Sequence, residues 1–364
     1  MTPLEAPPRR YEGLDALRAG AMLLGLAYHA TYAYVPDVGP WYPVVDPSSS
    51  PFFSSLAGAL HAFRMHVFFA LAGFLSHLLL EHRGVVGFLK DRARRLLAPL
   101  AVALPLTWLA DLGARTLSDR AGLMDSRYAL GTAVRFVPLH LWFLEYLFLF
   151  CVAAAVLWRL RLELPARLLR WALGFPEGLV LLAVPTGAVL ATGELKPDTS
   201  FLPQLSAVVV MGLFYSFGFV LWSVRDAVGV LARRGVWMAP AGLVLASWLY
   251  TRPLQWEPVG WALSAVVAWL VTLGSLAAAL RVKVAAGPVV RLLVDASYWI
   301  YLVHYPLVMV VQVLVARVPW GPGPKYLMVV ASVTCLALGT YAFLVRGSFL
   351  RSYLAAGRVP IKAA

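Results

Sequence analysis

The sequence predicts an all-α polytopic membrane protein. Of its 364 residues, 61% are hydrophobic and only 13% are charged, and the mean hydropathy is +0.75. A soluble domain of this length would need far more charged surface. Apolar runs of roughly 16–25 residues, the length of a helix that crosses about 30 Å of hydrocarbon, recur along the whole chain.

These runs predict about ten transmembrane helices, of which the two at 177–192 and 236–250 are short. The predicted ranges are 14–34, 56–80, 96–113, 138–158, 177–192, 203–223, 236–250, 258–280, 292–316 and 326–345. Short segments rich in Pro, Gly and Asp separate several of them, as expected for turns at the water boundary. Without an internal repeat or a soluble appendage, the chain is expected to form a single membrane domain over residues 1–364.

The distribution of basic residues predicts the orientation. The formal net charge is +13, but the lysines and arginines fall in short clusters between apolar runs, which argues against a nucleic-acid partner. About two thirds of them lie on one side if both termini are cytoplasmic, as the positive-inside rule requires. The terminal contributors to this count are Arg9, Arg10, Arg358 and Lys362.

The first apolar run carries titratable residues that are expensive in hydrocarbon unless they have a function. In "GLDALRAGAMLLGLAYHA", Asp15 and Arg18 stand near the start, and His29 follows the arginine by eleven positions. That spacing is about three helical turns, or roughly 16 Å, so Arg18 and His29 lie near one face at two depths. Alternatively, Asp15 and Arg18 form only a helix-end ion pair, or Arg18 extends to the interface.

The second run, "LHAFRMHVFFALAGFLSH", contains Arg64 and His66. In the predicted orientation, His66 comes to a depth similar to that of His29. Arg64 needs an anionic partner, either a structural one such as Asp111 or Glu145, or a substrate anion. A histidine in such a helix serves either as a general base or as a hydrogen-bonded link between helices.

Arg92 and Arg95 stand in "KDRARRLLAPL", which is expected to be an inner loop after the second helix. Their simplest interpretation is a topology signal. Two guanidinium groups three positions apart are equally suited to bind phosphate groups.

The fourth run begins "VPLHLWFLEYLFLF". His140 and Trp142 lie where an aromatic belt at the outer boundary is expected. Glu145 lies within the run, where a carboxylate needs a cationic or hydrogen-bonding partner.

The ninth run contains "DASYWIYLVHYPLVM". Ser297, Tyr301 and His304 follow helical spacing on one face, and Pro306 is expected to loosen the helix just beyond the histidine. Nothing resembles a phosphate-binding glycine loop, a zinc-ligand pattern or a nucleophile elbow, so neither a metal site nor a serine acyl-enzyme is expected.

Taken in order, the blocks on the first, second, fourth and ninth helices resemble the acyltransferase 3 superfamily of membrane acyltransferases, and most closely its members that succinylate osmoregulated periplasmic glucans. The resemblance implies ten helices in the bacterial inner membrane, and transfer of an acyl group from cytoplasmic acyl-CoA to a sugar hydroxyl on the periplasmic side. The family pattern maps onto Arg18 with His29, onto Arg92 with Arg95, and onto the block at His304. Glu145 departs from it.

Combined with the resemblance, the residues suggest a division of roles. His29 is expected to be the general base, Asp15 and Arg18 to hold the inner end of the site, and His304 to orient the acceptor or stabilise the oxyanion. Arg64 would pair with the distal carboxylate of a succinyl donor. The expected substrate-binding residues are Arg64, His66, Arg92, Arg95, Trp142, Glu145, Ser297 and Tyr301.

The expected partners are acyl-CoA as co-substrate, a glucan or other glycan acceptor and the lipid bilayer, with no tightly bound cofactor and no nucleic acid. Two alternatives remain open. One is an O-acetyltransferase of another surface polysaccharide, and the other is a secondary transporter or flippase for an anionic solute, which would use intramembrane charges equally well.

Overall fold

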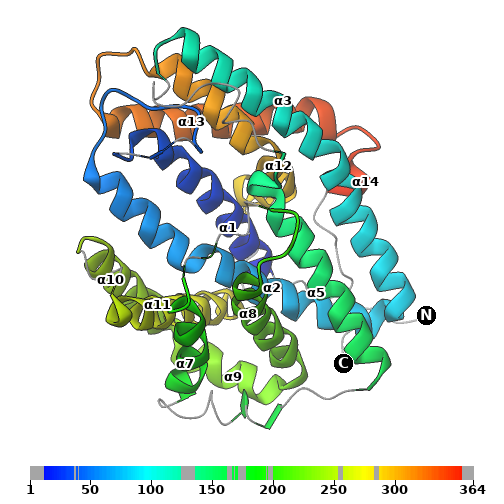
Figure 1. Cartoon of the computed structure of the whole chain (residues 1–364). Helices are drawn as coiled ribbons and strands as arrows, with labels where there is room; N and C mark the ends of the chain where they lie inside the picture. Colours follow the sequence, from blue (N-terminus) through cyan, green and yellow to red (C-terminus); the bar gives the residue numbers. More distant parts are fainter. Residues whose placement is uncertain are drawn as a thin grey trace.

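The structure is a computed structural model of the chain. It describes residues 12–36, 38–39, 41–123, 136–161, 166–167, 169–170, 178–193, 195, 200–252, 257–282 and 287–354. The terminal arginines and lysine used for orientation, Arg9, Arg10, Arg358 and Lys362, lie outside these residues. Within them, every regular element is helical (Figure 1).

The elements follow one another from α1 to α14 in chain order. They are α1 (Glu12–Thr31), η1 (Tyr32–Tyr34), α2 (Pro51–Arg92), η2 (Ala93–Leu97), α3 (Ala98–Arg120), η3 (Leu139–Leu141), α5 (Trp142–Arg159), α7 (Gly178–Leu190), α8 (Leu205–Ser223), α9 (Arg225–Arg234), η5 (Gly235–Trp237), α10 (Met238–Tyr250), α11 (Pro258–Arg281), α12 (Pro288–Val315), α13 (Pro322–Thr340), η7 (Tyr341–Val345) and α14 (Arg351–Leu354).

Within the described residues, each of the ten predicted ranges lies mostly in helix. Among the described residues, six continuous helical segments are long and apolar enough to cross a membrane, with α2, η2 and α3 counted as one segment, and 178–190 and 235–250 are shorter apolar helices. The polytopic all-α membrane class is therefore supported. Helix α9 was not predicted, because its ten residues have no continuous apolar run.

The prediction of an inner loop after the second helix is wrong. Helix α2 continues to Arg92 and runs through a five-residue π-helical turn directly into α3. The reason is packing: Phe88 and Leu96 within this charged stretch are buried in the core, so the chain stays helical instead of lifting into water. The break comes earlier, at Gly84, whose backbone is non-helical at φ 63° and ψ 174°.

Helix α1 occupies the interior of the bundle. It packs against α2, α11, α12 and α13. Helices α7 and α10 pack on α11, while α3 and α13 pack on α12, so α1 and α2 lie between two groups of helices (Figure 1). This arrangement surrounds the polar residues of α1 with protein, where a buried polar side chain can find partners.

The most extensive helix pair, α2 with α8, depends on two glycines. A Cβ atom at Gly73 would come within 1.9 Å of the Tyr215 carbonyl oxygen, and one at Gly218 within 1.8 Å of the Ala70 carbonyl oxygen. Only glycine permits backbones to approach this closely, as is usual where membrane helices associate by van der Waals packing.

The segment between α1 and α2 is held against one end of the bundle by buried polar contacts. Lys325 donates to the Asp46 carboxylate at 2.9 and 3.1 Å and to the Ala316 carbonyl. Gln312 of α12 accepts from the Tyr42 hydroxyl at 2.5 Å and donates to the Ala30 carbonyl at 3.0 Å. The second contact ties α12 to α1 at the residue that follows His29.

Candidate active site

Three buried histidines from distant parts of the sequence meet at one point. The ring centroids of His29 (α1) and His304 (α12) are 5.2 Å apart, those of His140 (η3) and His304 are 5.2 Å apart, and those of His29 and His140 are 6.4 Å apart. The Tyr305 ring lies 5.0 Å from both His29 and His140. We call His29, His140 and His304 the histidine triangle.

The backbone of α12 sets the orientation of His304. Its Nδ1 lies 2.7 Å from the Tyr301 carbonyl oxygen and 3.2 Å from that of Ile300. A carbonyl only accepts, so Nδ1 carries the hydrogen. In the neutral ring, the lone pair is then on Nε2, which is the atom available to take a proton or accept a hydrogen bond from a substrate.

A proline in α12 provides the partner of His140. Pro306 has no N–H and cannot donate to the carbonyl four residues earlier, that of Leu302. The freed Leu302 oxygen lies 3.3 Å from His140 Nε2, which donates to it. Helix α12 remains continuous through the proline, so the expected loosening takes the form of one released carbonyl. The Tyr301 hydroxyl completes the contact by donating to the His140 carbonyl at 2.9 Å.

Each histidine of the triangle retains a buried nitrogen without a hydrogen-bond partner among the described residues. These atoms are Nδ1 of His29, Nδ1 of His140 and Nε2 of His304. Leaving a buried polar atom unsatisfied costs about 1–3 kcal/mol, so three such atoms at one point indicate a site for a polar ligand. Within the described part of the chain, no group of His, Cys, Asp and Glu residues is arranged to hold a metal ion.

Arg64 lies at the edge of the triangle. A Cβ atom at Gly25 would be 3.2 Å from Arg64 Nη1 and 4.0 Å from His304 Nε2, so the guanidinium and the imidazole both border the space over this glycine. The Arg64 Cζ atom is 4.2 Å from the ring centroid of Tyr28. The Tyr28 hydroxyl is hydrogen-bonded to Nδ1 of His61 at 3.1 Å, and His61 is exposed, so this edge leads to the molecular surface.

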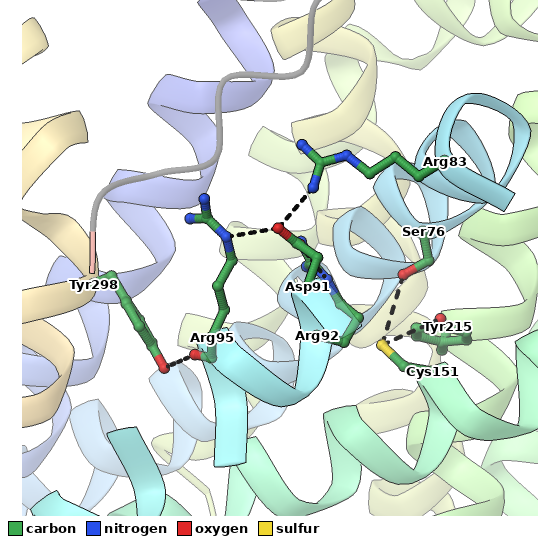
Figure 2. A network of polar contacts seen from close by, with 8 residues as sticks. All are labelled: Ser76, Arg83, Asp91, Arg92, Arg95, Cys151, Tyr215 and Tyr298. Atoms are coloured by element: carbon green, nitrogen blue, oxygen red, sulfur yellow. Dashed lines mark hydrogen bonds and ion pairs between the residues drawn. The ribbon is translucent and has the colours of Figure 1, made fainter. Parts of the chain in front are cut away.

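Arg92 and Arg95 converge on one carboxylate, that of Asp91 (Figure 2). Arg95 Nε lies 3.0 Å from Asp91 Oδ1, and the Arg92 guanidinium binds Oδ2 of the same group. A third guanidinium, that of Arg83, reaches Asp91 Oδ1 at 2.7 Å. Arg94 points elsewhere and donates to the Ser352 hydroxyl of α14 at 2.8 Å. We call Arg83, Asp91, Arg92 and Arg95 the arginine cluster.

Helix α12 links the two sites. The Tyr298 hydroxyl donates to the Arg95 carbonyl at 2.5 Å, and His304 follows Tyr298 by six positions, about 9 Å along the helix axis. The Tyr301 ring lies between them, stacked on Tyr298 at 6.2 Å and 6.1 Å from His304. A row of rings on one helix therefore leads from the arginine cluster to the histidine triangle.

Three of the expected site residues, Asp15, Arg18 and Ser297, are engaged within their own helices. Arg18 Nη2 lies 3.1 Å from Asp15 Oδ1, so the predicted i,i+3 ion pair is present on α1. The Ser297 hydroxyl donates to the Val294 carbonyl at 2.9 Å, which uses its hydrogen within α12.

The remaining expected substrate-binding residues are not brought to the triangle by any described contact. His66 packs its ring on Phe214 of α8 at 4.6 Å, although it shares α2 with Arg64. Trp142 is buried and meets the Tyr146 ring edge-on at 5.3 Å. Glu145 makes no hydrogen bond or ion pair with the residues that the structure describes. Of the partners expected for Arg64, Asp111 is bound by Arg115 at 2.8 Å.

Two functional candidates escaped the sequence analysis. His140 looked like part of an aromatic belt, and only the fold shows that η3 presents it to His304. Arg83 looked like one basic residue among several. The signal that could have found His140 is its position in the "HLWFLEYL" block, and the signal for Arg83 is the glycine that follows it.

Comparison with known proteins assigns the family. The sequence model of the acyltransferase 3 family, described as an acyltransferase domain, matches residues 11–342. The chain is similar to glucans biosynthesis protein C of Escherichia coli (strain K12), with 33% identity over 103 residues, which cover 28% of this chain and 26% of that protein. It is similar to the protein of the same name from Salmonella heidelberg (strain SL476), with 34% identity over 102 residues and the same coverage.

The aligned part spans only about a quarter of these relatives, 26% of their length. No solved structure matches the chain. The family match, in contrast, covers nearly the whole sequence and includes every residue of both sites. The predicted family is confirmed: this chain belongs to the acyltransferase 3 family of membrane acyltransferases.

Proposed function

We propose that this protein is an O-acyltransferase that moves an acyl group from cytoplasmic acyl-CoA to a hydroxyl of a periplasmic glucan. The observation that carries the proposal is the histidine triangle, in which three imidazoles from distant segments meet with unpartnered nitrogens beside Arg64. Acyl transfer to a sugar needs a group that accepts a hydroxyl proton and a group that steadies the negative carbonyl oxygen.

His29 is the proposed general base. It removes the proton of the acceptor hydroxyl while that oxygen attacks the thioester carbonyl carbon; the carbon–sulfur bond then breaks, and the CoA thiolate takes up the proton. His304 orients the acceptor by accepting its hydrogen bond at Nε2, or, in the protonated form, stabilises the oxyanion by donating from the same atom. Because Tyr301 and Ser297 donate to backbone carbonyls, their role is to shape α12 around His304.

The acyl donor is proposed to bind at the arginine cluster, with its phosphates on Arg92 and Arg95. Guanidinium groups are well suited to this because they form bidentate, charge-assisted hydrogen bonds with phosphate. From there the pantetheine arm would follow the Tyr298–Tyr301 row toward His304. Asp15 and Arg18 would hold the inner end of the site, with Arg18 roughly 16 Å and Asp15 about 21 Å below His29 along α1.

The acyl group is proposed to be succinyl, with Arg64 pairing with its distal carboxylate. Arg64 is buried and borders the space over Gly25, beside His304, where a second carboxylate would find a fixed cation. The resemblance to the relatives supports the glucan acceptor, since both are named for glucans biosynthesis. His66, Trp142 and Glu145 are proposed to act in acceptor binding.

The proposed setting is the bacterial inner membrane. The chain would cross it ten times as a single domain, with both termini in the cytoplasm. The helices at the predicted positions support several membrane crossings, and the bias of basic residues to one side supports this orientation. It places the arginine cluster at the cytoplasmic face and the exposed His61 at the periplasmic face, as a reaction across the membrane requires.

The direct test combines two measurements on purified protein in nanodiscs. CoA thiol release from succinyl-CoA is expected only when glucan is added, and mass spectrometry of the glucan is expected to show an added succinyl group. If the added group is acetyl, the donor is acetyl-CoA and not succinyl-CoA. If another glycan is modified, that glycan is the acceptor. Solute uptake in proteoliposomes without thiol release would overturn the enzymatic proposal in favour of a transporter.

A further inference from the structure

We propose that Arg83 is a third guanidinium ligand of the phosphate site, and that the backbone break at Gly84 places it there. The inference rests on the proposed function and deepens it. It starts from the geometry of the arginine cluster, in which three arginines from one helical segment converge on a single carboxylate (Figure 2).

Sequence spacing alone does not bring Arg83 to this point. It precedes Asp91 by eight positions, which on a straight helix is about 12 Å along the axis. Arg83 Nη1 nevertheless lies 2.7 Å from Asp91 Oδ1. Gly84 has φ 63° and ψ 174°, a conformation that is essentially restricted to glycine. The break changes the direction in which the Arg83 side chain points, so that its guanidinium lies beside Asp91 in the turns that follow.

The cluster has the features of an anion site. Each oxygen of Asp91 accepts from a guanidinium, and Oδ1 is shared by Arg83 and Arg95. One carboxylate thus gathers three planar groups whose donors suit phosphate oxygens. The Arg83 side chain is 34% exposed and that of Asp91 only 14%, so Arg83 forms the outer rim where a ligand would arrive. The adjoining π-helical turn is a feature often found at functional sites.

Two sources of phosphate are available at a cytoplasmic membrane face. One is the acyl-CoA of the proposed reaction, and the other is an anionic lipid headgroup. Arg94 offers a matched control. It lies between Arg92 and Arg95 and carries the same charge as Arg83. Its guanidinium, however, lies over the Tyr353 ring at 4.2 Å, away from Asp91.

The test measures CoA affinity and acyl transfer for Arg83→Gln, Arg94→Gln and Arg92→Gln in nanodiscs of either zwitterionic or anionic lipid. We expect Arg83→Gln to weaken CoA binding about tenfold, as loss of one charge-assisted contact from a side chain that is 34% exposed would. Arg94→Gln should change it less than about twofold. Transfer from an acyl-pantetheine donor, which has no phosphate, should be equal in the wild type and Arg83→Gln. A loss with that donor too would overturn the phosphate assignment.

Gly84→Ala is a second, independent variant. A Cβ atom there would meet nothing within 4 Å, so its effect would come from the backbone alone. If the break acts by placing Arg83, Gly84→Ala should weaken CoA binding to a similar degree, and adding it to Arg83→Gln should cause little further loss. Independent, multiplying losses would show that the break serves something other than Arg83.

The outcomes separate this inference from the proposed function. If the wild type has no measurable affinity for CoA, the proposed donor fails. If the wild type binds CoA and Arg92→Gln weakens it, but Arg83→Gln behaves like Arg94→Gln, only the role of Arg83 fails. If Arg83→Gln leaves CoA affinity unchanged but reduces binding of anionic lipid, Arg83 binds the headgroup and its assignment to the donor site is overturned.

Discussion

The histidine triangle and the arginine cluster are polar sites of opposite design. His304 is 1% exposed, its orientation is set by backbone carbonyls, and its free Nε2 borders the space over Gly25. Arg83 has a side chain that is 34% exposed, and its cluster is organised by one charged partner, Asp91, whose side chain is 14% exposed. Electrostatic interactions are much stronger in a desolvated site, whereas charges near water are screened by salt. The first design suits the chemical step and the second suits capture of a charged substrate.

This comparison predicts that variants of the triangle lower kcat and variants of the cluster raise KM. The largest effect is expected for His29→Ala. Loss of a general base typically costs 10²- to 10⁴-fold, so kcat should fall by about that factor with little change in KM for acyl-CoA. The measurement is thiol release under saturating donor and acceptor. His82→Ala, which removes an exposed histidine, is the control, and a His29→Ala enzyme within about threefold of the wild type would disprove the role of the base.

The next effect is expected for Arg92→Ala combined with Arg95→Ala. Two charge-assisted contacts from side chains that are only 18% and 22% exposed should together be worth about a hundredfold in KM for acyl-CoA, with kcat nearly unchanged. Raising the salt concentration should increase the wild-type KM and change that of the variant much less, because the screened charges are gone. If CoA affinity, measured by isothermal titration calorimetry, is unchanged in the double variant, these arginines do not bind the donor and serve only as topology signals.

A smaller effect is expected for Gly25→Ala. The new methyl group would lie 3.2 Å from Arg64 Nη1 and 4.0 Å from His304 Nε2, so it would push the guanidinium aside and occupy space meant for substrate. We expect kcat/KM to fall about tenfold, a change typical of small misplacements in an active site. Gly20→Ala on the same helix is the matched control, since a Cβ atom there meets nothing within 4 Å. Equal activities for the two variants would show that the space over Gly25 is not part of the site.

The smallest effect is expected for Pro306→Ala. Alanine restores an N–H that can donate to the Leu302 carbonyl, which then has to be shared with His140 Nε2. We expect kcat to fall about threefold to fivefold without loss of thermal stability, because one misoriented hydrogen bond is worth about 1 kcal/mol. Pro185→Ala, a proline inside α7, should have no such effect. A wild-type kcat for Pro306→Ala would mean that the freed carbonyl does not position His140.

Much of the architecture follows from apolar periodicity and composition. The ten apolar runs coincide with helix because each must satisfy its backbone hydrogen bonds internally in lipid, and the motif blocks were sufficient to predict the family. The places of His29, Arg64 and His304 within apolar runs were likewise evident, because charged and titratable residues stand out in such runs. The helical stretch through Arg92 was missed, since its charge masked the buried Phe88 and Leu96.

Only the packing of the helices decided which polar residues meet. His140 lies beside His304 because Pro306 frees the Leu302 carbonyl, which accepts a hydrogen bond from His140. His66, two residues from Arg64, packs on Phe214 instead. Arg83 reaches Asp91 because one glycine breaks α2. Hydrophobic patterns specify which segments become helices, since that depends on local transfer to lipid. Contacts across 160 or more positions, such as His140 with Leu302, depend on how close the helices approach and therefore exist only in the folded molecule.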